Sequence, residues 1–226
     1  MNSKLLILPL FFIVFCFSCK QSSKDQTEEV VVTEEAAVDS TTLPSGFSHV
    51  PYKETVQGLS GSLMKFVPEN YLVLDTATGD LNLDTIPDMI LVLKRNDEET
   101  TSDVSENPAK RPLLILIGQA DNTFKLAAKN ENTVYCIDCG GMMGDPYMSI
   151  TIKKGYFSVE HHGGSAWRWT RIITYKYSPE DNYWYLHKDG HESFHTGDPE
   201  KVTTKILTKK DFGVLKFDEF DIYKEE

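Results

Sequence analysis

Cysteine, positive charge and long apolar runs are all scarce in this sequence. Four cysteines in 226 residues exclude the dense disulfide framework of a small secreted scaffold. Lysine and arginine number 23 against 34 acidic residues, which gives a formal net charge of −11. Phosphate backbones and anionic lipid headgroups repel such a chain. The charge therefore argues against nucleic acid as a partner and against charge-driven adhesion to a membrane.

The apolar run at residues 5–17 is too short for a permanent membrane span, because it has about 13 residues and a spanning helix needs roughly 20. Lys4 precedes the run, Ser18 and Cys19 follow it, and the composition then turns polar. A basic start, a short apolar middle and a small residue before the cut are typical of a secretion signal.

This segment resembles a bacterial lipoprotein signal peptide, although Cys16 and Phe17 stand where a leucine and a small residue are more common. The resemblance implies that residues 1–18 are removed and that Cys19 becomes the fatty-acylated first residue. It also implies a lipoprotein of the cell envelope that meets the membrane through its lipid anchor. Ordinary secretion is the alternative.

Beyond the signal the chain has two parts. Residues 19–46 are polar and acidic, and they are predicted to form a disordered tether because so little apolar surface cannot offset the entropy of ordering. Residues 47–226 contain the aromatic and β-branched residues and are predicted to form one globular domain.

That domain is predicted to be mainly β, a single antiparallel β-meander with few short helices. Close turns separate the β-rich segments, and a parallel return would need a crossover of about a dozen residues. The expected strands are 71–75, 89–94, 113–118, 124–128, 148–152, 156–161, 166–177 and 183–187. The expected helices are 63–67 and 209–212, the second capped by Thr208 and ended by Gly213. Residues 96–110 are expected to form a long exposed loop.

Successive side chains of residues 166–177 would point to opposite faces of the expected strand, which predicts one packed face and one more solvent-exposed face. The packed face carries Trp167, Trp169, Arg171, Ile173, Tyr175 and Tyr177. Aromatic residues are dense in this region, and such a set forms either the core of the sheet or a platform for a sugar or protein ligand. The candidates for a platform are Trp167, Trp169, Tyr175, Tyr183, Trp184 and Tyr185. Residues 156–169 resemble a segment of small bacterial lipoproteins, which carries no assigned activity.

The segment 80–88 places oxygen-bearing residues at alternate positions, a spacing that can wrap a calcium ion, which takes six to eight oxygen ligands. The candidate ligands are Asp80, Asn82, Asp84, the backbone carbonyl of Ile86, and Asp88. An EF-hand is excluded because its twelfth position would be Leu91. The alternative is a turn in which the carboxylates cap backbone amides.

Residues 79–88 and the expected strand after them resemble the calcium loop of FG-GAP repeats in integrin-type propellers. Leu83 and Thr85 occupy positions where that repeat usually has glycine, which permits a positive φ. The pattern occurs once, whereas a propeller needs several copies, so a propeller is not implied.

Cys136 and Cys139 are the two cysteines that remain after processing, and their spacing predicts a local disulfide. A zinc site is the alternative, with further ligands from His161 and His162 or from the histidines at 187, 191 and 195. Redox catalysis is disfavoured because glycines follow the cysteine pair, where a redox motif would begin a helix.

Residues 187–195 are expected to form a solvated loop, because Gly190 disfavours a helix that would align their histidines.

These observations favour a noncatalytic binding or structural module, stiffened by calcium at residues 80–88. The alternative is an envelope hydrolase or metal-dependent enzyme that uses Cys136, Cys139 and nearby histidines. Convergence of the two thiols with imidazoles would favour the enzyme.

Overall fold

The computed structural model describes residues 61–224, which lie within one compact unit running from His49 to Glu226. The predicted signal peptide, Cys19 and the tether lie outside the described residues. Within residues 61–224, no helix is long and apolar enough to cross a membrane.

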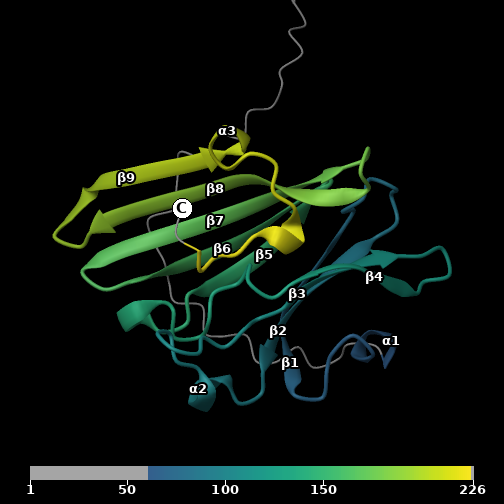
Figure 1. Cartoon of the computed structure of the whole chain (residues 1–226), viewed down its shortest axis with the longest axis horizontal. Helices are drawn as coiled ribbons and strands as arrows, with labels where there is room; N and C mark the ends of the chain where they lie inside the picture. The colour runs from purple at the N-terminus through teal and green to yellow at the C-terminus, as the bar shows by residue number, and fades with distance from the viewer. Residues whose placement is uncertain (1–60, 225–226) are drawn as a thin grey trace, which may run out of the picture. The chain divides into compact units, whose positions relative to one another are not determined.

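Two antiparallel sheets make up this unit (Figure 1). Sheet 1 contains β1 (Tyr71–Gly79), β2 (Asp88–Arg95), β3 (Leu113–Gly118) and β4 (Phe124–Asn130). Sheet 2 contains β5 (Tyr147–Lys153), β6 (Tyr156–Gly164), β7 (Trp167–Ser178), β8 (Tyr183–His195) and β9 (Asp198–Thr208). In both sheets each strand pairs with its neighbour in sequence, so the predicted mainly β, antiparallel meander is confirmed.

The helices are short. They are α1 (Gly61–Met64), α2 (Glu98–Thr101), α3 (Lys209–Phe212) and the 3-10 turns η1 (Gly141–Met143) and η2 (Phe217–Glu219). The predicted cap of α3 is present, because the Thr208 hydroxyl accepts from the Lys210 amide and Asp211 accepts from the Thr208 amide. Gly213 ends the helix at a positive φ of 75°.

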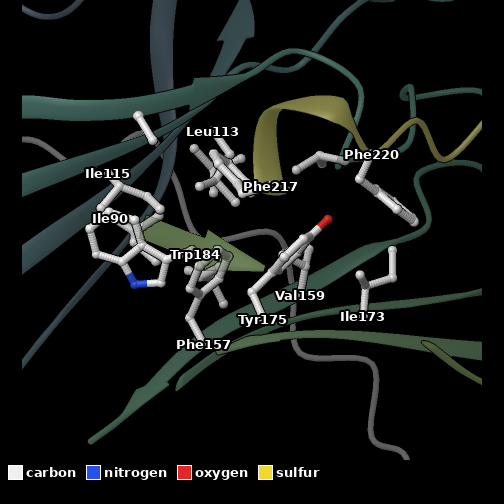
Figure 2. Packing of buried hydrophobic residues seen from close by; sticks show 14 of the residues in the cluster. Ile90, Leu113, Ile115, Phe157, Val159, Ile173, Tyr175, Trp184, Phe217 and Phe220 are labelled. Atoms are coloured by element: carbon white, nitrogen blue, oxygen red, sulfur yellow. The ribbon is translucent and has the colours of Figure 1, made fainter. Parts of the chain in front are cut away.

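One apolar core joins the two sheets. Ile90, Leu113 and Ile115 of sheet 1 face Phe157, Val159, Ile173 and Tyr175 of sheet 2, and Phe217 and Phe220 of the C-terminal segment lie beside them (Figure 2). Asn130 ties that segment to β4, since its side-chain amide donates to the carbonyls of Phe217 and Phe220. The opposite face of sheet 1 packs on α1 and the residues after it through Leu63, Phe66 and Val67.

Two local predictions are corrected by the structure, and one strand was missed. Residues 96–110 include α2, and Glu98 is buried there because Arg111 binds it. Residues 187–195 belong to β8 instead of a solvated loop, because β7 and β9 supply backbone partners on both sides. The edge strand β9 was not predicted, since its exposed sequence shows no apolar alternation and only its pairing with β8 defines it.

Candidate functional site

A row of basic side chains crosses sheet 2. Arg171 of β7 lies directly opposite His191 of β8, and His191 lies directly opposite Lys205 of β9. The Arg171 side chain lies on the same face of β7 as the core residue Ile173, because side chains two residues apart on a strand point the same way. We call Arg171, His191 and Lys205 the basic row.

The basic row lines a pocket of about 400 Å³ at the border of the core. Side chains of β7, β8 and β9 line it together with Tyr135 and residues 222–224. The polar lining consists of Tyr135, Arg171, Asp189, His191, Lys205 and Lys224. This volume falls in the range of small-molecule sites.

Arg171 is held rigidly at the base of this pocket. Its Nε and Nη2 donate to the two carboxylate oxygens of Asp189 at 3.0 and 2.6 Å, and Nη1 donates to the Tyr135 hydroxyl at 2.8 Å. Burial lowers the pKa of Arg171, but the bonds to Asp189 and Tyr135 outweigh it, so the pKa is raised and the charge is kept. Both partners of the pair are buried, so the geometry is fixed before any ligand arrives.

The other two members of the basic row are less constrained. Burial, followed by the nearby charge of Arg171, lowers the pKa of His191. Lys205 is exposed, and among residues 61–224 it makes no ion pair. The pocket therefore has a fixed arginine at its base and a freer lysine at its rim.

His161 continues the row into β6, opposite Arg171, but lies in the interior. Its Nε2 accepts from the Tyr135 amide at 3.3 Å, and its Nδ1 has no hydrogen-bond partner among the described residues. Burial, then the charges of Arg171 and Arg111, lowers the pKa of His161 to about 3. A neutral imidazole there supports the backbone of Tyr135.

Two tryptophans extend the same face of β7 past the pocket. Trp167 is 60% exposed and contacts His195 edge-on, while Trp169 is partly buried against Tyr135 with ring centroids 5.7 Å apart. We call Trp167 and Trp169 the tryptophan shelf. The six-residue platform considered from the sequence is therefore not one surface, because Tyr175 and Trp184 belong to the core.

The segment 80–88 forms a closed loop between β1 and β2. The Asp80 carboxylate accepts from the Thr85 amide, Asn82 accepts from the Asp84 amide, and Asp84 accepts from the Ile86 amide and from the Asn82 side chain. Leu83 and Thr85 have φ of 65° and 72°, in the left-handed region that favours glycine. Asp80 Oδ1 is buried and has no partner within residues 61–224.

Asp88 anchors this loop to sheet 1. It is fully buried, and its two oxygens accept from the amides of Leu81, Asn82 and Gly118 at 2.7, 3.3 and 2.9 Å. Burial raises the pKa of Asp88, against the effect of these amide donors. The carboxylates of this loop do not form a cluster of three within 4.8 Å of one another, as judged over the described residues.

Cys136 and Cys139 are joined by a disulfide in the structure. Between them, Asp138 accepts from the Ser102 hydroxyl at 2.6 Å and from the Val104 amide at 2.8 Å, which ties this turn to the segment after α2. Cys136, Asp138 and Cys139 are the one close group of potential metal ligands in residues 61–224, and no histidine belongs to it. The alternative zinc site would need His161 or the histidines of β8 beside these cysteines, and no histidine lies in this group among the described residues.

The sequence analysis did not predict most of the residues that line the pocket. It placed Arg171 on the packed face of β7, and a buried arginine requires a carboxylate partner, which indicates that an acidic residue must lie nearby. The partner could not be identified from sequence, because Asp189 lies 18 residues away and its position opposite β7 depends on the bulge between Thr174 and Tyr175. The second network, Arg111 with Glu98 and Asp145, joins the segment after β2 to the turn before β5 and was likewise missed.

The chain matches no known family model, no curated protein and no solved structure. Function therefore has to be inferred from the chain itself.

Proposed function

We propose that this protein is a lipid-anchored component of the bacterial cell envelope whose β unit is a noncatalytic binding module for a glycan. The observation that carries the proposal is the tryptophan shelf beside a polar pocket, since exposed indole rings stack on the apolar faces of sugars. The rings lie on a regular strand, so the surface is organised in advance.

A sedimentation assay tests the module. The mature chain with Cys19→Ser, which removes the lipid, should co-sediment with purified cell-wall sacculi without releasing reducing sugar ends. Trp167→Ala should reduce the bound fraction severalfold, because it removes the most exposed ring of the shelf. Val214→Ala, which truncates an exposed apolar residue on another segment, is the control and should bind normally. Release of reducing ends would instead support the hydrolase alternative.

The anchor is tested separately. Wild-type protein produced in bacteria should incorporate a fatty-acid analogue and fractionate with membranes, and Cys19→Ser should do neither. Cys16→Ser, inside the predicted signal peptide, is the matched substitution and should still be labelled. Equal labelling of the Cys19→Ser protein would refute lipidation at this cysteine.

We also propose that calcium stabilises the loop at residues 80–88. Two features support this: Leu83 and Thr85 have positive φ at the two positions where the FG-GAP pattern has glycine, and Asp80 Oδ1 lacks a partner among the described residues. Calcium at one hundred times its dissociation constant would stabilise the fold by about 2.7 kcal/mol. The ligands would be Asp80, Asn82, Asp84, the Ile86 carbonyl and Asp88. Zinc is the less favoured metal, since its proposed thiols form a disulfide.

Thermal denaturation after chelation tests this idea. Added calcium should raise the melting temperature of the wild type, and Asp84→Ala should abolish that rise. Glu106→Ala, an exposed carboxylate elsewhere, should keep it. Absence of a calcium-dependent shift in wild-type protein at millimolar calcium would leave residues 80–88 as a self-capped turn.

A further inference from the structure

The positive charges of the basic row are not all paired with carboxylates among the described residues. Arg171 and Lys205 lie on either side of His191 in cross-strand register, and burial favours the neutral form of that imidazole. Asp189 binds Arg171 through both of its oxygens, and the Lys224 ammonium lies 4.0 Å from the Asp221 carboxylate. Lys205 makes no ion pair among residues 61–224. An anion in the pocket would pair with the Lys205 ammonium.

The pocket also offers directed donors. The Tyr135 oxygen accepts from Arg171, so the hydroxyl hydrogen is left to donate elsewhere, and among the described residues it is bound to no acceptor. Tyr135 and Lys205 both line this pocket. One neutral and one charged donor suit a carboxylate, whose two oxygens accept in different directions.

The tryptophan shelf adjoins these donors. Trp169 lies two residues from Arg171 on the same face of β7, which corresponds to roughly 7 Å along a strand. Its ring also touches Tyr135 of the pocket wall. A ligand that fills the pocket with its charged group therefore has an aromatic surface for the adjoining ring.

We infer that the ligand is a small acidic sugar, whose carboxylate enters the pocket at Lys205 and Tyr135 while a sugar ring packs on the tryptophan shelf. This inference rests on the proposed function and adds the chemical class of the glycan. A short ligand is favoured over a long polyanion, because the whole chain carries a formal charge of −11 and repels extended negative charge.

Calorimetric titration of the mature Cys19→Ser chain with digalacturonate tests the inference. Digalacturonate should bind at least tenfold more tightly than digalactose, and its affinity should fall with added salt. Lys205→Gln should weaken digalacturonate binding about tenfold, the loss of one charge-assisted hydrogen bond. Lys210→Gln makes the same charge change on α3, outside the pocket, and should leave the affinity unchanged.

The remaining outcomes separate this inference from the proposed function. If digalactose binds as well as digalacturonate and Trp167→Ala weakens both, the glycan module stands and the acidic class is wrong. If inorganic phosphate competes as strongly as digalacturonate, the pocket is a general anion site and the inference that the ligand is a sugar is wrong. If sacculi are bound through Trp167 but Lys205→Gln has no effect in either assay, the pocket does not contribute.

Discussion

At the scale of single residues, the two buried arginines within residues 61–224 are both paired with carboxylates. Arg111 binds Glu98 and Asp145, each at 2.7 Å, and Arg171 binds Asp189 at 2.6 Å. A buried charge without its partner costs several kcal/mol, so each pair constrains the segments that supply it. His161 is also buried but carries no charge that needs a partner, because its lowered pKa keeps the imidazole neutral.

His161 should make the protein less stable as the pH falls. Its pKa is about 6.5 when unfolded and is lowered to about 3 in the fold, mainly by burial. Between these values the unfolded chain binds a proton that the folded chain does not. The free energy of unfolding should then fall by up to about 1.4 kcal/mol per pH unit below pH 6.5. His161→Gln keeps an acceptor for the Tyr135 amide and should remove this contribution.

Urea denaturation at several values between pH 6.5 and 4.5 measures the difference. The pH slope of the unfolding free energy should be shallower in His161→Gln than in the wild type. Burial also lowers the pKa of His187, but this side chain is exposed, so His187→Gln should change the slope less than His161→Gln does. Parallel slopes for wild type and His161→Gln would mean that His161 is protonated in the fold.

At the scale of elements, the loop at residues 80–88 keeps a conformation that its residues do not favour. Thr85 is exposed and β-branched, yet it has a φ of 72°. A left-handed conformation costs a residue with a Cβ roughly 1–2 kcal/mol. The amides of Leu81, Thr85 and Ile86 nevertheless donate to the carboxylates of Asp88, Asp80 and Asp84 respectively, and these bonds hold the loop in place.

Thr85→Gly should therefore stabilise the protein, by about 0.5–1 kcal/mol after the extra chain entropy of glycine is counted. Thermal denaturation in chelator measures this without any contribution from metal. Thr204→Gly removes an equally exposed threonine from extended strand β9 and should instead destabilise the protein. A loss of stability in both variants would show that φ at Thr85 is not a source of strain.

At the scale of the whole described unit, the two sheets share one core and should unfold together. Residues of β2, β3, β6, β7 and η2 pack in the same cluster. The three tryptophans of the chain, Trp167, Trp169 and Trp184, all belong to sheet 2, so their fluorescence reports that sheet and, through Trp184, the shared core. Far-ultraviolet circular dichroism reports both sheets.

Ile90→Ala, in sheet 1, should lower the stability of both sheets equally, by about 2–5 kcal/mol, because it opens a cavity in the shared core. Urea unfolding followed by fluorescence and by circular dichroism should give coincident midpoints in the wild type and the variant. Ile206→Ala, on the exposed edge strand, is the control and should have a much smaller effect. Separate transitions would mean that each sheet folds alone.

Local sequence was sufficient to predict the hairpins of this protein and the alternation of β7. Turns need particular residues, and Asn122, Lys154 and Asn182 have the positive φ values expected of such turns. The cap of α3 was predictable for the same reason, since Thr208 and Asp211 act within one turn. The signal peptide, the lipidated Cys19 and the calcium ligands are predictions from sequence that stay predictions.

Only the tertiary structure decided which segments share a surface. The division into two sheets, the continuation of β8 through Gly190 and the existence of β9 all depend on which strands pair, which the residues of each segment do not show by themselves. The basic row arises the same way, because cross-strand register brings Arg171, His191 and Lys205 together from three strands. Sequence specifies what each segment prefers locally. Burial and register, which are properties of the whole chain, determine which of its side chains meet.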